Sequence, residues 1–148
     1  MDTSVLPIII LLPLVLGTIL IPWLKQFSRG ATAFGAIAVS LSSLTLLLTQ
    51  AKAVFNGQVI LETWHWLPQL GLNLSFRLDA LGLLFSLLIT GIGTLIFIYA
   101  YYYLSPKNSL SKLYTLLMLF MAAMLGISLS NNLMLLLVFW ELTSISSF

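Results

Sequence analysis

The sequence of 148 residues contains no cysteine and few charged residues. Without cysteine the chain cannot form disulfides, thiolate nucleophiles, zinc fingers or cysteine-bound iron–sulfur clusters. Only 7% of its residues are charged, whereas soluble domains carry about a quarter and disordered chains combine low hydrophobicity with high net charge. Six basic and four acidic residues also leave no basic patch for a nucleic acid. The shortage of charge therefore argues against a soluble domain, a disordered chain and a nucleic-acid partner.

The sequence motifs of common enzyme active sites are also missing. There is no glycine-rich phosphate loop, no His-Glu-x-x-His zinc motif, no Gly-x-Ser-x-Gly nucleophile motif and no haem attachment motif. His65 is the only histidine, and a histidine without a second ligand nearby does not indicate a metal site. We therefore expect no catalytic residue, no metal and no cofactor in this chain.

What the sequence does contain is apolar residues, which make up 60% of it and form long runs. A run of about 20 such residues crosses a hydrocarbon core of about 30 Å. The runs predict an all-α polytopic membrane protein, a single membrane domain over 1–148 with about five transmembrane helices. We expect these helices at residues 5–24, 31–49, 80–104, 113–129 and 133–148. The last run is still apolar at Phe148, so we expect the sequence to be a fragment of a larger bundle.

Between the second and third predicted helices the pattern changes from helix to strand. Apolar and polar residues alternate from 72 to 78, which is typical of a strand, and residues 59–66 supply a partner strand. An open hairpin cannot lie exposed in lipid, because its edge groups would have no hydrogen-bond partner. The sequence therefore predicts a short β-hairpin over 58–78, outside the bilayer.

Three charged residues belong to this extramembrane region. Asp79 directly precedes the helix predicted for 80–104, which is a position where a carboxylate caps the helix. Glu62 and Arg77 lie on the two predicted strands, and we expect them to form an exposed ion pair that contributes little stability.

Basic residues are divided unequally between the two sides of the membrane that these helices predict. One side holds Lys25, Arg29, Lys107 and Lys112, and the other holds Lys52 and Arg77. Cytoplasmic loops carry an excess of Lys and Arg. We therefore expect the N-terminus and the hairpin to lie outside the cell.

Glu141 is the only charged residue deep within a predicted span. It lies nine residues after Asn132, or about 13 Å along a helix, which is close to the bilayer midplane. An ionised carboxylate at that depth costs at least about 2.5 kcal/mol, so a cation, water or protonation must offset the charge. The same half of the helix holds four further residues, Trp140, Thr143, Ser144 and Ser147. We expect Glu141 and this supporting polar face to line a polar interior, and the aliphatic side to face lipid or packed helices.

Two interpretations of Glu141 remain open at this point. A carboxyl group whose pKa is raised by desolvation and lowered by a nearby cation can exchange a proton near neutral pH, which is what a proton relay requires. Alternatively, Glu141 joins helices through a fixed ion pair, and the chain is a passive scaffold.

Several segments carry a resemblance to a known family. They are residues 76–81 (Phe-Arg-Leu-Asp-Ala-Leu), 91–104 and 119–148, the last with Asn-Asn-Leu at 131–133 and Phe-Trp-Glu-Leu-Thr-Ser at 139–144. These segments resemble the antiporter-like subunits that respiratory complex I and the multisubunit Mrp sodium/proton antiporters share. The whole chain is most similar to the N-terminal part of the MrpA-type member of these subunits. The complex I proton-channel subunit typically has Gly-Trp-Glu-Gly-Val-Gly at the last motif, and Ala80 stands where the family usually has glycine.

The resemblance implies a role for Glu141. In such subunits the matching acid, on the fifth transmembrane helix, pairs with a lysine on a later, broken helix, and changes in that pair move protons along a polar axis at mid-membrane. The implied function is a proton-translocating subunit of a monovalent cation (Na+)/proton antiporter in the inner (cell) membrane of a bacterium. Its implied partners are the other subunits, the lipid bilayer, protons and Na+. The alternatives are a proton-pumping membrane subunit of an NADH:quinone oxidoreductase and the passive scaffold.

Overall fold

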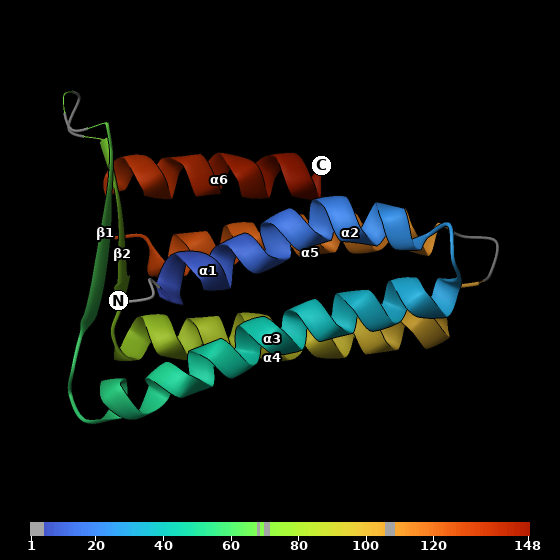
Figure 1. Ribbon diagram of the computed structural model, residues 1–148, viewed down its shortest axis with the longest axis horizontal. Helices are drawn as coiled ribbons and strands as arrows, with labels where there is room; N and C mark the ends of the chain where they lie inside the picture. The colour runs from blue at the N-terminus through green and yellow to red at the C-terminus, as the bar shows by residue number, and fades with distance from the viewer. Residues whose placement is uncertain (1–4, 68, 70–71, 106–108) are drawn as a thin grey trace.

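The computed structural model describes residues 5–67, 69, 72–105 and 109–148. Within these residues the chain is mainly helical, and four helices are long and apolar enough to cross a membrane. Figure 1 shows the helices side by side, with a two-stranded hairpin lying across one set of their ends. The predicted all-α polytopic fold with a hairpin between the second and third spans is confirmed. Lys107, which contributed to the predicted orientation, lies outside the described residues.

The helices and strands follow the predicted order, although some of their ends are shifted. In chain order they are α1 (Val5–Leu11), the π-helical turn η1 (Leu12–Leu16), α2 (Gly17–Leu24), α3 (Arg29–Phe55), β1 (Ile60–Leu67), β2 (Leu72–Leu78), α4 (Ala80–Tyr103), α5 (Leu110–Leu129) and α6 (Leu133–Ser147). The first three are continuous and together form one span, Val5–Leu24. The π-helical turn within it contains Pro13, which has no amide hydrogen to complete an α-helical hydrogen bond.

The second span is longer than the 31–49 predicted for it. α3 begins at Arg29 because the hydroxyl of Ser28 accepts a hydrogen bond from an amide of the first turn at 3.0 Å. The helix continues to Phe55, and the chain turns at Gly57, whose φ of 82° favours glycine. The apolar run ends at Thr49, but Gln and Lys are good helix formers, so the helix extends beyond the apolar run.

Hydroxyl groups join the helices where they meet inside the bundle. The Ser40 hydroxyl oxygen of α3 lies 2.7 Å from that of Thr94 in α4, and the Ser86 hydroxyl of α4 lies 3.0 Å from that of Ser128 in α5. Ser40 and Ser86 are fully buried. Because lipid tails are as apolar as the helix surfaces, close packing and such hydrogen bonds hold membrane helices together. They fix α3, α4 and α5 relative to one another.

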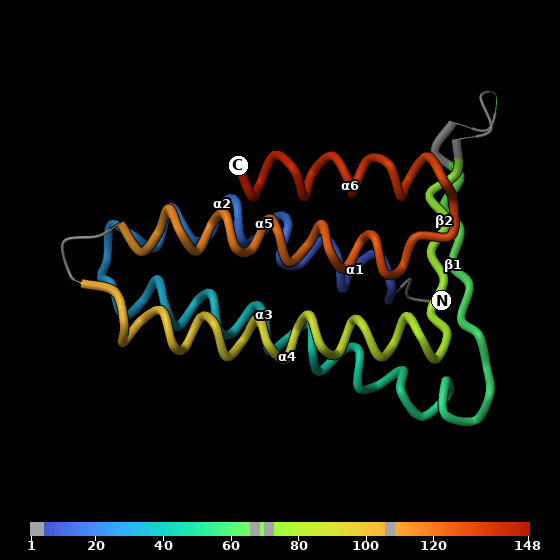
Figure 2. Tube along the Cα trace, turned by 180° about the vertical axis from the view of Figure 1, so that it is seen from behind, coloured from blue at the N-terminus to red at the C-terminus, as the bar shows by residue number. Residues whose placement is uncertain are grey.

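α6 corresponds to the fifth predicted span and lies beside α5, as Figure 2 shows. It is an apolar helix of 15 residues, shorter than the four spans. At 1.5 Å per residue it is about 22 Å long. Leu135 and Phe139 are its buried apolar side chains. The short turn of Ser130, Asn131 and Asn132 makes α5 and α6 antiparallel neighbours.

The register of the hairpin shows why one sequence-based expectation fails. β1 and β2 are antiparallel, and Leu61 lies opposite Arg77 while Glu62 lies opposite Phe76. Residues directly opposite one another share a face of the hairpin, and neighbours along a strand point to opposite faces. The predicted ion pair between Glu62 and Arg77 is therefore wrong, because the two side chains leave opposite faces. Arg77 Nη2 lies 3.2 Å from Asp79 Oδ2 instead.

Candidate functional site

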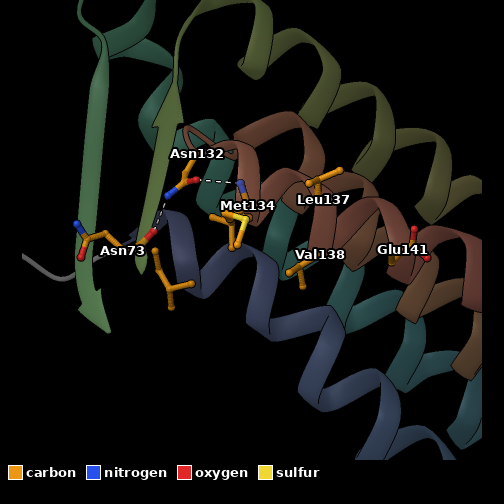
Figure 3. Close-up of a pocket in the computed structure, with 8 residues that line it drawn as sticks. Asn73, Asn132, Met134, Leu137, Val138 and Glu141 are labelled. Carbon is orange, nitrogen blue, oxygen red and sulfur yellow. Dashed lines mark hydrogen bonds between the residues drawn. The ribbon is translucent and has the colours of Figure 1, made fainter. Parts of the chain in front are cut away.

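Glu141 is the only acidic residue within the described helices. Its side chain is exposed, and it borders a cavity of about 490 Å³. The other lining residues are Asn73, Leu74, Asn132, Met134, Leu135, Leu137 and Val138. In Figure 3 Glu141 lies at one end of this group, while Asn73 and Asn132 lie at the other end beside the hairpin. The cavity is therefore mostly apolar, with an acid at one end and two amides at the other.

The rotation of α6 directs Glu141 away from α5. Phe139 is buried against α5, and Glu141 follows two residues later, which places it about 200° around the helix. The predicted packing of the aliphatic side of α6 against other helices is observed. Among the described residues, however, the Glu141 side faces the open cavity rather than a polar interior.

The four residues predicted to support Glu141 form hydrogen bonds within their own helix. Thr143 Oγ1 donates to the Trp140 carbonyl at 2.6 Å, and Ser144 Oγ donates to the same carbonyl at 3.4 Å. Ser147 Oγ donates to the Ser144 carbonyl at 3.3 Å. Trp140 is itself 58% exposed. The structure places these residues near Glu141 on α6, but within the described chain no hydrogen bond connects them to its carboxylate.

No described residue forms a hydrogen bond or an ion pair with the Glu141 carboxylate. The carboxylate oxygens are therefore available at the edge of an apolar cavity. An acid inside a membrane is costly and pairs with another polar group or with water when it is charged. Such a carboxyl group can act as a proton carrier, because its charge depends on what approaches it.

A close contact between α5 and α6 sets the rotation that directs Glu141. Gly126 of α5 lies under the ring of Phe139, and a Cβ atom at Gly126 would overlap that ring. Small residues at a helix interface allow this close approach in membranes. The sequence analysis missed this pair, because a single glycine in an apolar run does not reveal what lies opposite it.

The start of α6 is fixed by an amide that the sequence analysis also missed. Asn132 is the N-cap of α6, and its Oδ1 accepts a hydrogen bond from the Met134 amide at 2.9 Å. Its Nδ2 donates to the Asn73 carbonyl of β2 at 3.3 Å. Asparagine before an apolar helical run is a recognised capping signal, so this residue could have been found from the sequence.

Asp79 caps α4 at the same end of the bundle. Its Oδ1 accepts a hydrogen bond from the Gly82 amide at 2.8 Å, and its Oδ2 pairs with Arg77. Asp79 lies far along the chain from Glu141, and its contacts are those of a helix cap. It supports the fold and does not border the cavity beside Glu141.

We expect Asp79→Ala to destabilise the protein by about 1 kcal/mol, because the cap of α4 is lost. Asp79→Asn is the matched control. It keeps an acceptor oxygen for the Gly82 amide and loses only a partly exposed ion pair, which contributes little. Thermal unfolding of the purified full-length protein measures both. Equal losses in the two variants would show that the ion pair, and not the cap, stabilises this end.

Comparisons with known proteins agree with this geometry. Residues 64–114 match the family described as NADH-Ubiquinone oxidoreductase (complex I), chain 5 N-terminus. Over 145 residues, which are 98% of this chain, the sequence is 42% identical to the Na(+)/H(+) antiporter A1 subunit of Staphylococcus aureus. The chain spans 18% of the length of that relative.

Solved structures show the same fold. The chain superimposes on part of the Mrp complex from Dietzia sp. with a TM-score of 0.80 and 28% identity, covering 96% of this chain and 15% of that one. The membrane-bound sulfane sulfur reductase, an archaeal respiratory membrane complex, gives a TM-score of 0.80 at 23% identity, covering 97% of this chain and 22% of that one. The second likeness concerns the fold alone. Sequence and fold together identify the chain as a member of the antiporter-like subunit family that complex I and the Mrp antiporters share.

Proposed function

We propose that this chain forms part of a proton-translocating subunit of a multisubunit monovalent cation (Na+)/proton antiporter, with Glu141 as a proton carrier. The observation that carries the proposal is the position of Glu141. It is the sole acid of the described helices, it borders an apolar cavity, and no described residue engages its carboxylate. The 42% identity to an antiporter subunit over nearly the whole chain supports the antiporter branch of the family.

The proposed mechanism follows from what surrounds the carboxyl group. Apolar surroundings favour the neutral acid, and an approaching cation favours the carboxylate. A cationic side chain that moves toward and away from the cavity would therefore make Glu141 release and take up a proton. Because the chain spans 18% of its relative, we assign this cation to the lysine on a later, broken helix that the family resemblance implies.

We further propose that the subunit lies in the inner (cell) membrane of a bacterium with the hairpin outside. Lys25, Arg29 and Lys112 belong to the end of the bundle opposite the hairpin. There Arg29 donates to the carbonyls of Leu104 and Ser105, at the end of α4. Cationic groups are favourable at a helix C-terminus and in cytoplasmic loops, which supports this orientation. Other subunits of the complex, the bilayer, protons and Na+ are the proposed partners.

The assay that tests the proposal follows proton movement in membrane vesicles. Vesicles that contain the full-length protein in its complete complex are loaded with a proton gradient reported by a fluorescent dye. We expect added Na+ to collapse the gradient, and we expect vesicles from cells lacking the protein to show no such response. A gradient that is insensitive to Na+, K+ and Li+ in both preparations would contradict the proposed antiport.

The second candidate is a proton-pumping subunit of an NADH:quinone oxidoreductase. The family match over residues 64–114 is the observation that favours it, because the family is described by complex I. In that case NADH oxidation would build up a proton gradient in the same vesicles, and Na+ alone would not affect it. The two outcomes are exclusive in this assay.

A further inference from the structure

Three helices begin next to the β-hairpin at one end of the bundle. They are α1, α4 and α6, and Figure 1 shows the hairpin crossing their first turns. The first amide groups of a helix have no hydrogen-bond acceptor inside the helix, and they carry partial positive charge. Such amides need acceptors from elsewhere in the chain. In α1 and α6 these acceptors come from the hairpin or from a residue bonded to it.

Glu62 of β1 supplies the acceptors for α1. Its Oε1 accepts a hydrogen bond from the Val5 amide at 3.0 Å, and its Oε2 accepts one from the Leu6 amide at 3.1 Å. The side chain is partly buried, and it is separated from Val5 by 57 positions in the sequence. Hydrogen bonds to an ionised acceptor are stronger than neutral ones, and a carboxylate at a helix N-terminus also interacts favourably with the helix dipole. Glu62 therefore fastens β1 to the first turn of α1.

β2 is fastened in a similar way to the turn before α6. The Asn131 amide donates to the Ser75 carbonyl at 2.8 Å, and its side-chain Nδ2 donates to Ser75 Oγ at 3.2 Å. Asn132 binds the Asn73 carbonyl through Nδ2 and caps α6 through Oδ1. A β-bridge between Phe76 and Ser130 completes the contact. The first turn of α6 is thus held by β2.

The two attachments are connected through the hairpin itself. Glu62 lies directly opposite Phe76 in the register of β1 and β2, and Phe76 bridges Ser130. A continuous path of hydrogen-bonded residues therefore runs from the start of α1, through the hairpin, to the start of α6. Coupling between distant parts of a protein is carried by such contiguous networks.

We propose that the hairpin is a clasp in which Glu62 and Asn132 are positioning residues that set the height of α6, and so of Glu141, relative to α1. The proposal rests on the proposed function only in the choice of Glu141 as the group whose position matters. Glu62 acts at one end of the clasp and Asn132 at the other. Neither residue contacts a transported ion in this proposal.

Amide hydrogen exchange in the full-length complex tests the attachment of α1. In Glu62→Ala the Val5 and Leu6 amides lose both acceptors, and we expect peptides covering the start of α1 to exchange about tenfold faster, as for the loss of a helix cap. Leu61→Ala is the matched control, because Leu61 is the neighbouring residue of β1, lies on the other face and is 61% exposed. We expect it to exchange at the wild-type rate.

The position of Glu141 is read by its reaction with dicyclohexylcarbodiimide, a hydrophobic reagent for carboxyl groups in membranes. We expect Glu62→Ala and Asn132→Ala each to change the rate of Glu141 modification at least twofold, and Leu61→Ala to leave it unchanged. A residue that only stabilised its own surroundings would not alter the modification of an acid at the far end of the cavity. Glu62→Gln retains one acceptor oxygen, and it serves as the milder variant, with a smaller change in the same direction.

Two results would overturn the clasp. One is wild-type amide exchange at the start of α1 in Glu62→Ala and Glu62→Gln. The other is faster exchange there with an unchanged rate of Glu141 modification in every variant. Neither measurement requires transport, so failure of the sodium assay would remove the proposed function without deciding on the clasp.

Discussion

Replacing Glu141 with glutamine in the full-length protein is expected to reduce sodium-dependent proton movement to the level of vesicles that lack the complex. Glutamine has nearly the same size and remains polar, but it cannot bind and release a proton at physiological pH. The measurement is the dye response to added Na+ in vesicles with equal amounts of assembled complex. Glu141→Asp keeps a titratable carboxyl group on a shorter side chain, so we expect it to retain part of the activity.

The matched control for this variant is Ile145→Gln. Ile145 lies one turn further along α6, is 68% exposed, and does not border the cavity beside Glu141. It introduces the same amide into the same helix without removing an acid, and we expect exchange to continue. Normal exchange in Glu141→Gln, with normal assembly, would leave the passive scaffold as the better interpretation. The scaffold also predicts that Glu141→Leu does not affect growth in high salt and alkali.

The sequence was sufficient to predict the architecture because lipid imposes strong constraints. The apolar runs give the spans, and the change to period two gives the hairpin, since each pattern has one structure that satisfies its backbone in or beside a bilayer. Glu141 could be singled out for the same reason, as an acid within an apolar helix. These inferences depend on local composition alone.

The sequence was not sufficient where the answer depends on which residues meet. The contact between Glu62 and α1 joins residues 57 positions apart, and the hairpin register decided that Glu62 faces α1 and not Arg77. The rotation of α6 likewise depends on Gly126, which lies in another helix. A helical wheel separates the polar side of α6 from its aliphatic side, but it does not show which of them is covered.

The second large effect is expected for Gly126→Ala. A Cβ atom at Gly126 would overlap the ring of Phe139 at its attachment to the side chain, not at a flexible end. The ring therefore cannot turn aside, and α6 must move away from α5. Overpacking of this kind costs about 1–3 kcal/mol in protein cores. We expect a lower melting temperature of the purified full-length protein, together with reduced sodium-dependent proton movement because Glu141 moves with α6.

Gly91→Ala provides the matched control for the change in Gly126. Gly91 lies in α4, and a Cβ atom there would meet no atom within 4 Å. Because alanine is a better helix former than glycine, we expect Gly91→Ala to keep the melting temperature or to raise it slightly. The two variants add the same methyl group to two membrane helices, so a difference between them measures the contact with Phe139.

A double variant separates this contact from any other effect at Gly126. Phe139→Ala removes the ring, so that the added methyl group of Gly126→Ala has room. We expect the double variant to be no less stable than Phe139→Ala alone, which means that the two changes are far from additive, as residues in direct contact are. Additive losses in melting temperature would show that Gly126 does not act through Phe139. The rotation of α6, and with it the direction of Glu141, would then have to be set elsewhere along the interface with α5.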